Sequence, residues 1–447
     1  MQNVADALAE LDNMELMCFY LNENQFMEFE SVGAGIGGGF SNTGELRPMK
    51  LKEALAGPDG KEWKKEIRKE HQRMIDNKVF KPVKRWTLDD DTNVIDSTWA
   101  CKKKANGTLR GRLTARGFKQ IEGQHYDSSD IHAPVTNAVT IRIVLVLFLL
   151  AGNWIWNIVD VEGAFLHGLF KPGEEVHIEI PEGWEEFYDD DDVLLLGKTL
   201  YGTKQAAMAF WRELLKAMKK MKKKRSWADP CLYFEWTSHG LCLIVSWIDD
   251  NLIVGPPEAV KETKDKLMKL FKCKDLGEAM EYVGCKLTRT KDSIKFTQGV
   301  LLQRFRDEFH TDPGKKWTSP AQPGSILTKT DDDPKLTSAM QTYLRSGIGI
   351  LMHIMQWSRP EMSHPTRDLA KHMNDSRESA VPAMHRAMEY AMQRPDRGLT
   401  LKPKGTWDGS KDYKFKVRGR SDTNYANCPE TRHSVTGTRV SVNGSVT

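Results

Sequence analysis

The chain has 447 residues, with 65 Lys and Arg against 61 Asp and Glu, a net charge of +4, 40% hydrophobic residues and 28% charged residues. This length predicts two to four domains, and the globular composition excludes a wholly disordered chain, a collagen-like fibre and a membrane bundle. Seven cysteines without a Cys-X-X-Cys pair argue against a disulfide framework or a closed zinc site, and favour a reducing compartment.

The N-terminal segment differs in charge from the rest of the chain. Residues 1–46 contain eight acidic residues and no Lys or Arg, so the remaining chain is more basic than the net charge indicates. A basic body favours an anionic partner such as nucleic acid, although ordinary solubility charge gives the same balance. Residues 31–46 are rich in Gly and Ser but follow no predicted strand, which indicates a flexible linker rather than a phosphate-binding loop.

A helical segment and a basic hairpin are predicted next. Residues 50–78 have apolar side chains at helical spacing, interrupted by a Pro-Asp-Gly turn at 58–60. Residues 94–118 are predicted to form two strands joined by an Ala105-Asn106-Gly107 turn. Alternation places the arginines of the second strand on one face, which suits either contact with phosphates or exposure to solvent. These residues are Arg110, Arg112 and Arg116.

The middle of the chain alternates between apolar and basic segments. An apolar stretch at residues 143–151 indicates a buried helix, because a membrane span needs roughly 20 residues. Six of the seven residues at 219–225 are basic, at the end of a helix predicted over 205–225, and they suggest either contact with nucleic-acid phosphates or a solvated helix face. The other predicted elements are strands at 155–160, 174–180, 232–236 and 241–247 and a helix at 258–271.

Two apolar strands lead into carboxylates. Asp160 ends the strand at 155–160, and Asp249 and Asp250 follow the strand at 241–247. Apolar strands are normally central and buried, so acids at their ends need a compensating charge, and hard oxygen ligands select Mg²⁺ or Mn²⁺. Two such ions can activate a 3′-hydroxyl and stabilise a leaving pyrophosphate. The acidic run at 189–192 lacks apolar strands on both sides and is predicted to be a solvated loop.

Three motifs together resemble the reverse transcriptase of copia-type retrotransposons. They are Asn157–Gly168 (NIVDVEGAFLHG), Leu200–Trp211 (LYGTKQAAMAFW) and Ser246–Gly255 (SWIDDNLIVG). The resemblance extends over roughly residues 48–447, including a segment at 421–437 that is similar to the opening of an RNase H domain. One departure lies beside the Asp pair, where Trp247 and Ile248 replace the usual Tyr and Val, and a bulky Trp there could alter the efficiency of the enzyme.

The resemblance implies an α+β, right-hand polymerase fold of fingers, palm and thumb with an antiparallel palm sheet. Five regions are expected: a flexible acidic extension at 1–47, fingers and palm at 48–290, a thumb-like segment at 291–342, a connection at 343–410 and the truncated start of an RNase H domain at 411–447. Of the RNase H carboxylates only Asp422 is matched, because Asn424 stands where a second acid is usual. We therefore expect no autonomous RNase H activity.

The resemblance also assigns the catalytic centre. The metal-binding acids are matched by Asp160, Asp249 and Asp250, and the carbonyl of Val161 is a further expected metal ligand. Phe165 matches the aromatic residue that favours dNTP over rNTP, with core packing as the alternative.

Further contacts with substrate are expected from polar and basic residues. Gln205 matches a glutamine near the 3′-hydroxyl of the nucleotide, with an exposed helix start as the alternative. The expected triphosphate-binding residues are Arg112 and Arg116, and the expected nucleic-acid contacts are Lys204, Lys222, Lys223 and Lys224. For Lys204 a solvated lysine is the open alternative.

The leading hypothesis is an RNA-directed DNA polymerase that uses Mg²⁺ or Mn²⁺, dNTPs and an RNA or DNA template-primer. No membrane is expected as a partner, whereas other retroelement proteins are possible partners. The expected location is a virus-like particle in the cytoplasm, with the nucleus as the alternative. The alternatives are a catalytically inactive nucleic-acid-binding remnant of a retrotransposon polyprotein and a metal-dependent nuclease that uses the same acids.

Overall fold

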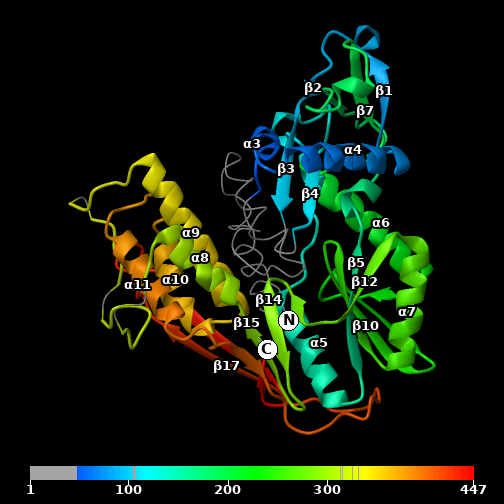
Figure 1. The fold of residues 1–447 in the computed structure, drawn as a ribbon. Helices are drawn as coiled ribbons and strands as arrows, with labels where there is room; N and C mark the ends of the chain where they lie inside the picture. Colours follow the sequence, from blue (N-terminus) through cyan, green and yellow to red (C-terminus); the bar gives the residue numbers. More distant parts are fainter. Residues whose placement is uncertain (1–47, 104–106, 313, 315, 325, 331) are drawn as a thin grey trace.

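The computed structural model describes residues 48–103, 107–312, 314, 316–324, 326–330 and 332–447. The predictions for residues 1–47 and for Ala105 and Asn106 fall outside these residues. The described chain is a mixed α and β structure, in which the N-terminal region lies above a central sheet and a helical layer lies to the left of that sheet in the view of Figure 1. No helix in the described ranges is long and apolar enough to cross a bilayer.

A six-stranded antiparallel sheet forms the centre of the molecule. Its strand order is β12-β5-β11-β10-β9-β8, and the strands predicted at 155–160, 232–236 and 241–247 are confirmed as three of its members. The strands are β5 (Ile155–Val161), β8 (Lys224–Arg225), β9 (Leu232–Thr237), β10 (Gly240–Trp247), β11 (Asp250–Gly255) and β12 (Cys273–Glu278).

Both faces of the central sheet are covered, because apolar side chains alternate along its strands. Ile158 and Val245 pack with helix α5 in one core, whereas Val159 and Ile244 pack with α6 and α7 in another. The strands are therefore apolar on both faces, as their sequences indicate. The covering helices are α5 (Ala138–Ala151), α6 (Ala206–Lys220) and α7 (Pro257–Leu270).

Two predicted elements are shorter than expected. Helix α6 ends at Lys220 rather than at residue 225, because Lys222 has a left-handed backbone with φ of 63° and the next residues pair with β9 as strand β8. The strand predicted at 174–180 is reduced to β6 (His177–Ile178), which pairs with two different neighbours.

The N-terminal region encloses its own core. Trp63, Trp99 and Trp184 are buried there between two helices, a four-stranded sheet of order β1-β7-β6-β2 and an antiparallel hairpin of β3 and β4. The helical break at the Pro-Asp-Gly turn and the hairpin strands are confirmed, although residues 94–95 belong to the four-stranded sheet. The elements are α3 (Leu51–Ala56), α4 (Gly60–Asp76), β1 (Phe80–Lys84), β2 (Val94–Ile95), β3 (Ser97–Lys103), β4 (Leu109–Ala115) and β7 (Asp192–Leu196).

A second sheet and the helical layer follow the central sheet. The second sheet has the order β13-β14-β15-β16, and the chain forms the entire helical layer between β15 and β16. The helices share one core. The boundary expected between the thumb-like segment and the connection, at residues 342 and 343, falls inside helix α9. The elements are β13 (Glu281–Tyr282), β14 (Cys285–Arg289), β15 (Ile294–Thr297), α8 (Gly299–Phe309), α9 (Ser338–Trp357), α10 (Ser363–Ala370), α11 (Ala380–Met392) and β16 (Leu399–Leu401).

The C-terminal residues form a three-stranded antiparallel sheet. Its strands are β17 (Val417–Asn424), β18 (Val435–Val442) and β19 (Ser445–Val446), and every residue of β17 is exposed. Short 3₁₀ helices complete the secondary structure: η2 (Arg85–Thr87), η3 (Gly117–Lys119), η4 (Ser128–Asp130), η5 (Ala164–His167), η6 (Glu185–Phe187) and η7 (Pro360–Met362).

Candidate active site

Two neighbouring strands bring the predicted aspartates together. Strands β5 and β11 are antiparallel neighbours, and Asp160 lies directly opposite Asp250 in their register. Residues opposite each other in such a pair have Cα atoms about 4.5–5.5 Å apart. The backbone N–H of Val161 also donates a hydrogen bond to the carbonyl of Asp249, at 2.9 Å. Residues that are far apart in the sequence therefore form one acidic group at the end of the central sheet.

Asp249 lies in a strained two-residue turn between β10 and β11. The turn consists of Ile248 and Asp249, because Trp247 pairs with Asp250 across the hairpin. Ile248 has a φ of 55°, a left-handed conformation that is unfavourable for a β-branched residue and costs about 1–3 kcal/mol. The side chain of Asn251 donates to the Asp249 carbonyl at 3.1 Å and helps to hold the turn. Strain of this kind persists where the surroundings fix the backbone, often at functional sites.

The acidic group lacks enough internal compensation for its charge. Burial raises the pKa of Asp250, and the neighbouring charges of Asp249 and Asp160 raise it further. Burial, followed by the charge of Asp160, likewise raises the pKa of Asp249. Asp250 is 2% exposed, and its Oδ2 atom is buried without a hydrogen-bond partner in the described chain. A buried carboxylate oxygen without a donor is the kind of atom that a cation would satisfy.

Basic side chains from two other strands act on Asp160. Burial raises the pKa of its carboxyl, whereas Arg110, Arg112 and Lys274 lower it. Lys274 lies opposite Asp160 on β12. Arg110 and Arg112 of the hairpin are therefore close enough to Asp160 to favour its charged form, whereas Arg116 pairs with Asp96. The sequence placed Arg110 beside Arg112 on the basic face of the hairpin, but it assigned no role to Lys274, because no local signal revealed the pairing of β12 with β5.

An aromatic pair lies next to Arg112. The guanidinium of Arg112 is 5.0 Å from the centre of the Tyr201 ring, and the ring of Phe165 meets that of Tyr201 edge to face at 5.2 Å. Phe165 is half-buried in η5, where its carbonyl accepts a hydrogen bond from Thr199 Oγ1 at 2.6 Å. Tyr201 thus connects two of the predicted nucleotide-binding residues, and the sequence assigned it no role.

Arg116 and Gln205 are held by internal partners. Arg116 donates to Asp96 Oδ2 at 2.7 Å. Gln205 is 2% exposed, and its amide donates to the His125 carbonyl at 2.7 Å and accepts from Gln120 at 3.1 Å. Gln205 therefore begins α6 as a buried residue, and the alternative of an exposed helix start is wrong. The predicted nucleotide contacts of Arg116 and Gln205 stay predictions.

The predicted nucleic-acid contacts fall into different environments. Lys204 donates to the hydroxyl of Tyr126 at 2.9 Å, and Lys222 and Lys224 are exposed. Lys223 requires a correction, because its side chain is fully buried. It donates to Thr263 at 2.8 Å and pairs with Glu235 at 3.0 Å, and so cannot reach a phosphate. Lys223 directly precedes strand β8, and the pairing of β8 with β9 brings it beside Glu235 of β9.

Asp422 is separate from these groups. It lies on the exposed strand β17, opposite Gly437 of β18. Its expected place in an RNase H domain stays a prediction.

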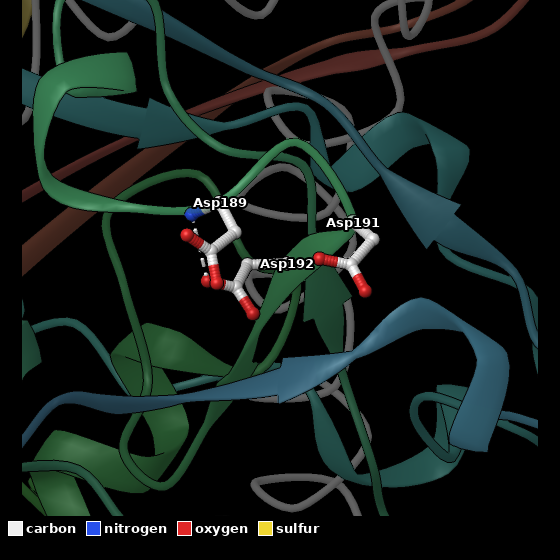
Figure 2. Close-up of side chains that lie close together, drawn as sticks. All are labelled: Asp189, Asp191 and Asp192. Atoms are coloured by element: carbon white, nitrogen blue, oxygen red, sulfur yellow. Dashed lines mark hydrogen bonds between the residues drawn. The ribbon is translucent and has the colours of Figure 1, made fainter.

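A second acidic group lies on the surface of the N-terminal region. Figure 2 shows the carboxylates of Asp189, Asp191 and Asp192 gathered around one turn. In the described ranges, they are the only set of three acidic, His or Cys side chains whose ligand atoms all lie within 4.8 Å of one another. The ammonium of Lys84 contacts all three, at 2.7, 2.8 and 3.0 Å. The predicted solvated loop is therefore a surface turn in which three carboxylates share the charge of one lysine.

Comparison with known proteins places the chain in a family. The family model described as "Reverse transcriptase (RNA-dependent DNA polymerase)" matches residues 77–322, more than half of the chain. The chain belongs to the reverse transcriptase family. This match includes Asp160, Asp249 and Asp250, and it confirms the family that the three sequence motifs indicated.

The curated relatives are much longer proteins. The chain is 30% identical over 333 residues to the retrovirus-related Pol polyprotein from transposon TNT 1-94 of Nicotiana tabacum. It is 27% identical over 342 residues to the corresponding polyprotein from transposon RE1 of Arabidopsis thaliana. These alignments cover 72% and 73% of this chain but 24% and 23% of the relatives, so the chain spans about a quarter of their length.

Among solved structures, a foamy viral protease-reverse transcriptase in complex with double-stranded DNA aligns with a TM-score of 0.42 at 10% identity. The alignment covers 85% of this chain and 54% of that chain.

Proposed function

We propose that this chain is the RNA-directed DNA polymerase of a copia-type retrotransposon. The observation that carries the proposal is the register of β5 and β11, which sets Asp160 opposite Asp250 beside the Asp249 turn in a chain of the reverse transcriptase family. On this proposal the central sheet is the palm and the N-terminal region the fingers. The helical layer supplies thumb and connection, and β17–β19 correspond to the start of an RNase H domain.

The donor set of the acidic group fits divalent cations. Asp160, Asp249 and Asp250 would hold Mg²⁺ or Mn²⁺, because all the donors are carboxylate oxygens and one buried oxygen of Asp250 lacks a partner. The carbonyl of Val161 is a further proposed ligand. When bound, such ions activate the primer 3′-hydroxyl and neutralise charge on the leaving pyrophosphate. The aspartates themselves contribute by holding carboxylate oxygens at fixed positions on the ends of β5 and β11.

Basic and aromatic residues of the fingers would position the dNTP. Arg110 and Arg112 face the carboxylates and carry charge suited to the triphosphate. Phe165 and Tyr201 form an aromatic pair beside Arg112 that would pack against the nucleotide sugar. An aromatic ring at Phe165 leaves no room for a 2′-hydroxyl and so favours dNTP.

The role of Phe165 is tested by shortening its side chain. Phe165→Val should increase use of rNTP relative to dNTP, measured as the ratio of incorporation efficiencies on one template. An unchanged ratio would remove Phe165 from sugar selection and leave it as a packing residue.

The edge strand β8 is the best-supported nucleic-acid contact on the palm. Lys224 and Arg225 of the strand and Lys222 just before it are exposed, and Trp227, two residues after the strand, is fully exposed. Lysines alone would serve to keep an edge strand from pairing with other chains, but an exposed tryptophan works against that purpose. Cations bind phosphates and an exposed indole stacks on unpaired bases, so this edge fits a single-stranded template.

The proposed activity is tested by primer extension. The purified chain should extend an oligo(dT) primer on a poly(A) RNA template when Mg²⁺ and dTTP are supplied. Chelation of the Mg²⁺ should stop the reaction. Binding of template-primer without extension would support a catalytically inactive remnant of a polyprotein. Release of nucleotides in the absence of dNTP would instead support a metal-dependent nuclease.

A further inference from the structure

Helix α9 joins two hydrophobic cores. Leu344 and Ile348 pack with α8, α10 and α11 in the core of the helical layer. Trp357, the last residue of the same helix, is 1% exposed and belongs instead to the core that α5 forms with the central sheet. The end of α9 is therefore packed into the central sheet, while most of the helix belongs to the helical layer.

Trp357 contacts the residue that precedes the carboxylate turn. Its ring lies edge to face against that of Trp247, with centroids 5.8 Å apart and planes at 81°. Trp247 is also directly opposite Asp250 in the β10–β11 ladder. Side chains of directly opposite residues project from the same face of a sheet, with Cβ atoms about 4.5–5.5 Å apart. Trp357, Trp247 and Asp250 thus follow one another as neighbours.

The last turn of α9 is fixed from outside the helical layer. Arg142 of α5 donates a hydrogen bond to the carbonyl of Gln356. Ser358 donates to the side chain of Gln298, which lies between β15 and α8, at 2.6 Å. These bonds restrict the position of the Trp357 ring, because they hold the residues on both sides of it, one through its carbonyl and the other through its hydroxyl.

We propose that Trp357 is a positioning residue for the metal-binding carboxylates, acting through Trp247. Its ring fixes the Trp247 indole, and the Trp247 ladder position fixes Asp250 and the strained Ile248–Asp249 turn. The indole of Trp247 provides the surface that meets Trp357. This inference rests on the proposed function, since it assigns a role within the same site.

The test measures metal binding and nucleotide incorporation separately. Trp357→Ala should weaken Mn²⁺ binding, measured without nucleotide by the electron paramagnetic resonance signal of free Mn²⁺. It should also lower the incorporation rate per titrated active site by roughly ten- to hundredfold, because small displacements of reacting groups are costly. The dissociation constant for template-primer should stay unchanged. Trp357→Phe retains an aromatic ring and should recover most of both losses.

A second variant protects the test against simple unfolding. Trp247 is half-buried, so Trp247→Ala is less disruptive and should reproduce the loss of Mn²⁺ affinity. The Mn²⁺ affinity of the double variant should equal that of the more affected single variant, because the two residues act in series. Additive losses would contradict the proposal.

Trp407 provides the matched control. It is 5% exposed in the same core as Trp357 but contacts Trp154, at 5.2 Å, instead of the carboxylate turn. Trp407→Ala should lower the thermal midpoint without changing Mn²⁺ affinity. Equal Mn²⁺ shifts in Trp407→Ala and Trp357→Ala would overturn the proposal. If the unaltered chain binds Mn²⁺ but fails to extend primers, the proposed polymerase function fails while the Mn²⁺ comparison still decides the role of Trp357.

Discussion

The two acidic groups of this protein contain similar side chains in opposite surroundings. Asp189 and Asp191 are exposed and share the ammonium of Lys84. Asp250 is buried, and one of its carboxylate oxygens has no hydrogen-bond partner in the part of the chain that the structure describes. The surface group is the tighter of the two, yet all three of its carboxylates already have an ion-pair partner in Lys84. Close spacing of carboxylates therefore does not by itself leave an oxygen without a partner, whereas the burial of Asp250 does.

The largest expected difference between the groups is in catalysis. Asp249→Asn should lower primer extension by roughly a hundredfold or more, since a charge that stabilises the transition state is lost, while template-primer binding remains. Asp191→Asn should leave extension at the level of the unaltered chain. Gel-based extension and filter binding measure the two properties. Near-normal extension by Asp249→Asn would refute the assignment of the buried group.

The pH dependence of stability should have opposite signs in the two groups. Burial and neighbouring charges raise the pKa of Asp249 to about 6 and that of Asp250 to about 9 in the folded chain, whereas an unfolded Asp titrates near about 4. Protonation of these groups therefore favours folding, and in chelator their contribution is fully present below about pH 4 and is lost as the pH rises through about 6 and about 9. A hydrogen bond from the Asp189 backbone and the bond with Lys84 instead lower the pKa of Asp192. Its contribution is present at neutral pH and is lost in acid.

Urea unfolding in chelator at several pH values measures this contrast. The free energy of unfolding should fall between about pH 5 and about pH 9, and Asp250→Asn should flatten that fall because the amide carries no charge. Asp192→Asn should leave it in place. A profile of Asp250→Asn that matches the unaltered chain would show that Asp250 is not the titrating group.

The smallest effect is expected from removing the surface lysine. Lys84→Met leaves three clustered carboxylates without their ammonium, so the surface group should acquire weak Mn²⁺ binding, with a dissociation constant on the order of millimolar. Primer extension should not change. A titration followed by electron paramagnetic resonance would detect the additional site. If no new site appears, compensation by Lys84 is not what distinguishes the two groups.

Local sequence pattern predicted the buried group well. Asp160 and Asp249 were found because apolar strands lead into them, and the reverse transcriptase motifs around them are contiguous in the sequence. The pattern could not separate Lys223 from Lys222 and Lys224, since pairing of β8 with β9 and a bond to Glu235 decide which lysine is buried.

Long-range partners were the other gap in the prediction. Lys84 reaches the acidic turn from a strand about a hundred residues earlier in the chain, and no local signal links them. Lys274 likewise reaches Asp160 only through the pairing of β12 with β5. Helix α6 ends early because Lys222 has a left-handed backbone. Its end could not be predicted from the sequence, because the residue at this position is neither Gly nor Asn.

Strands β15 and β16 are neighbours although the whole helical layer separates them in the sequence. Phe296 pairs with Leu399, so the polypeptide leaves and re-enters the second sheet at adjacent points. Re-entry is tight at Gly398, where an added Cβ would collide with the Phe296 carbonyl oxygen. Loops of the helical layer can thus gain or lose residues over generations without shifting any strand register. Such changes would leave the sheet that carries the aspartates in place, except where the end of α9 packs against it through Trp357 and Trp247.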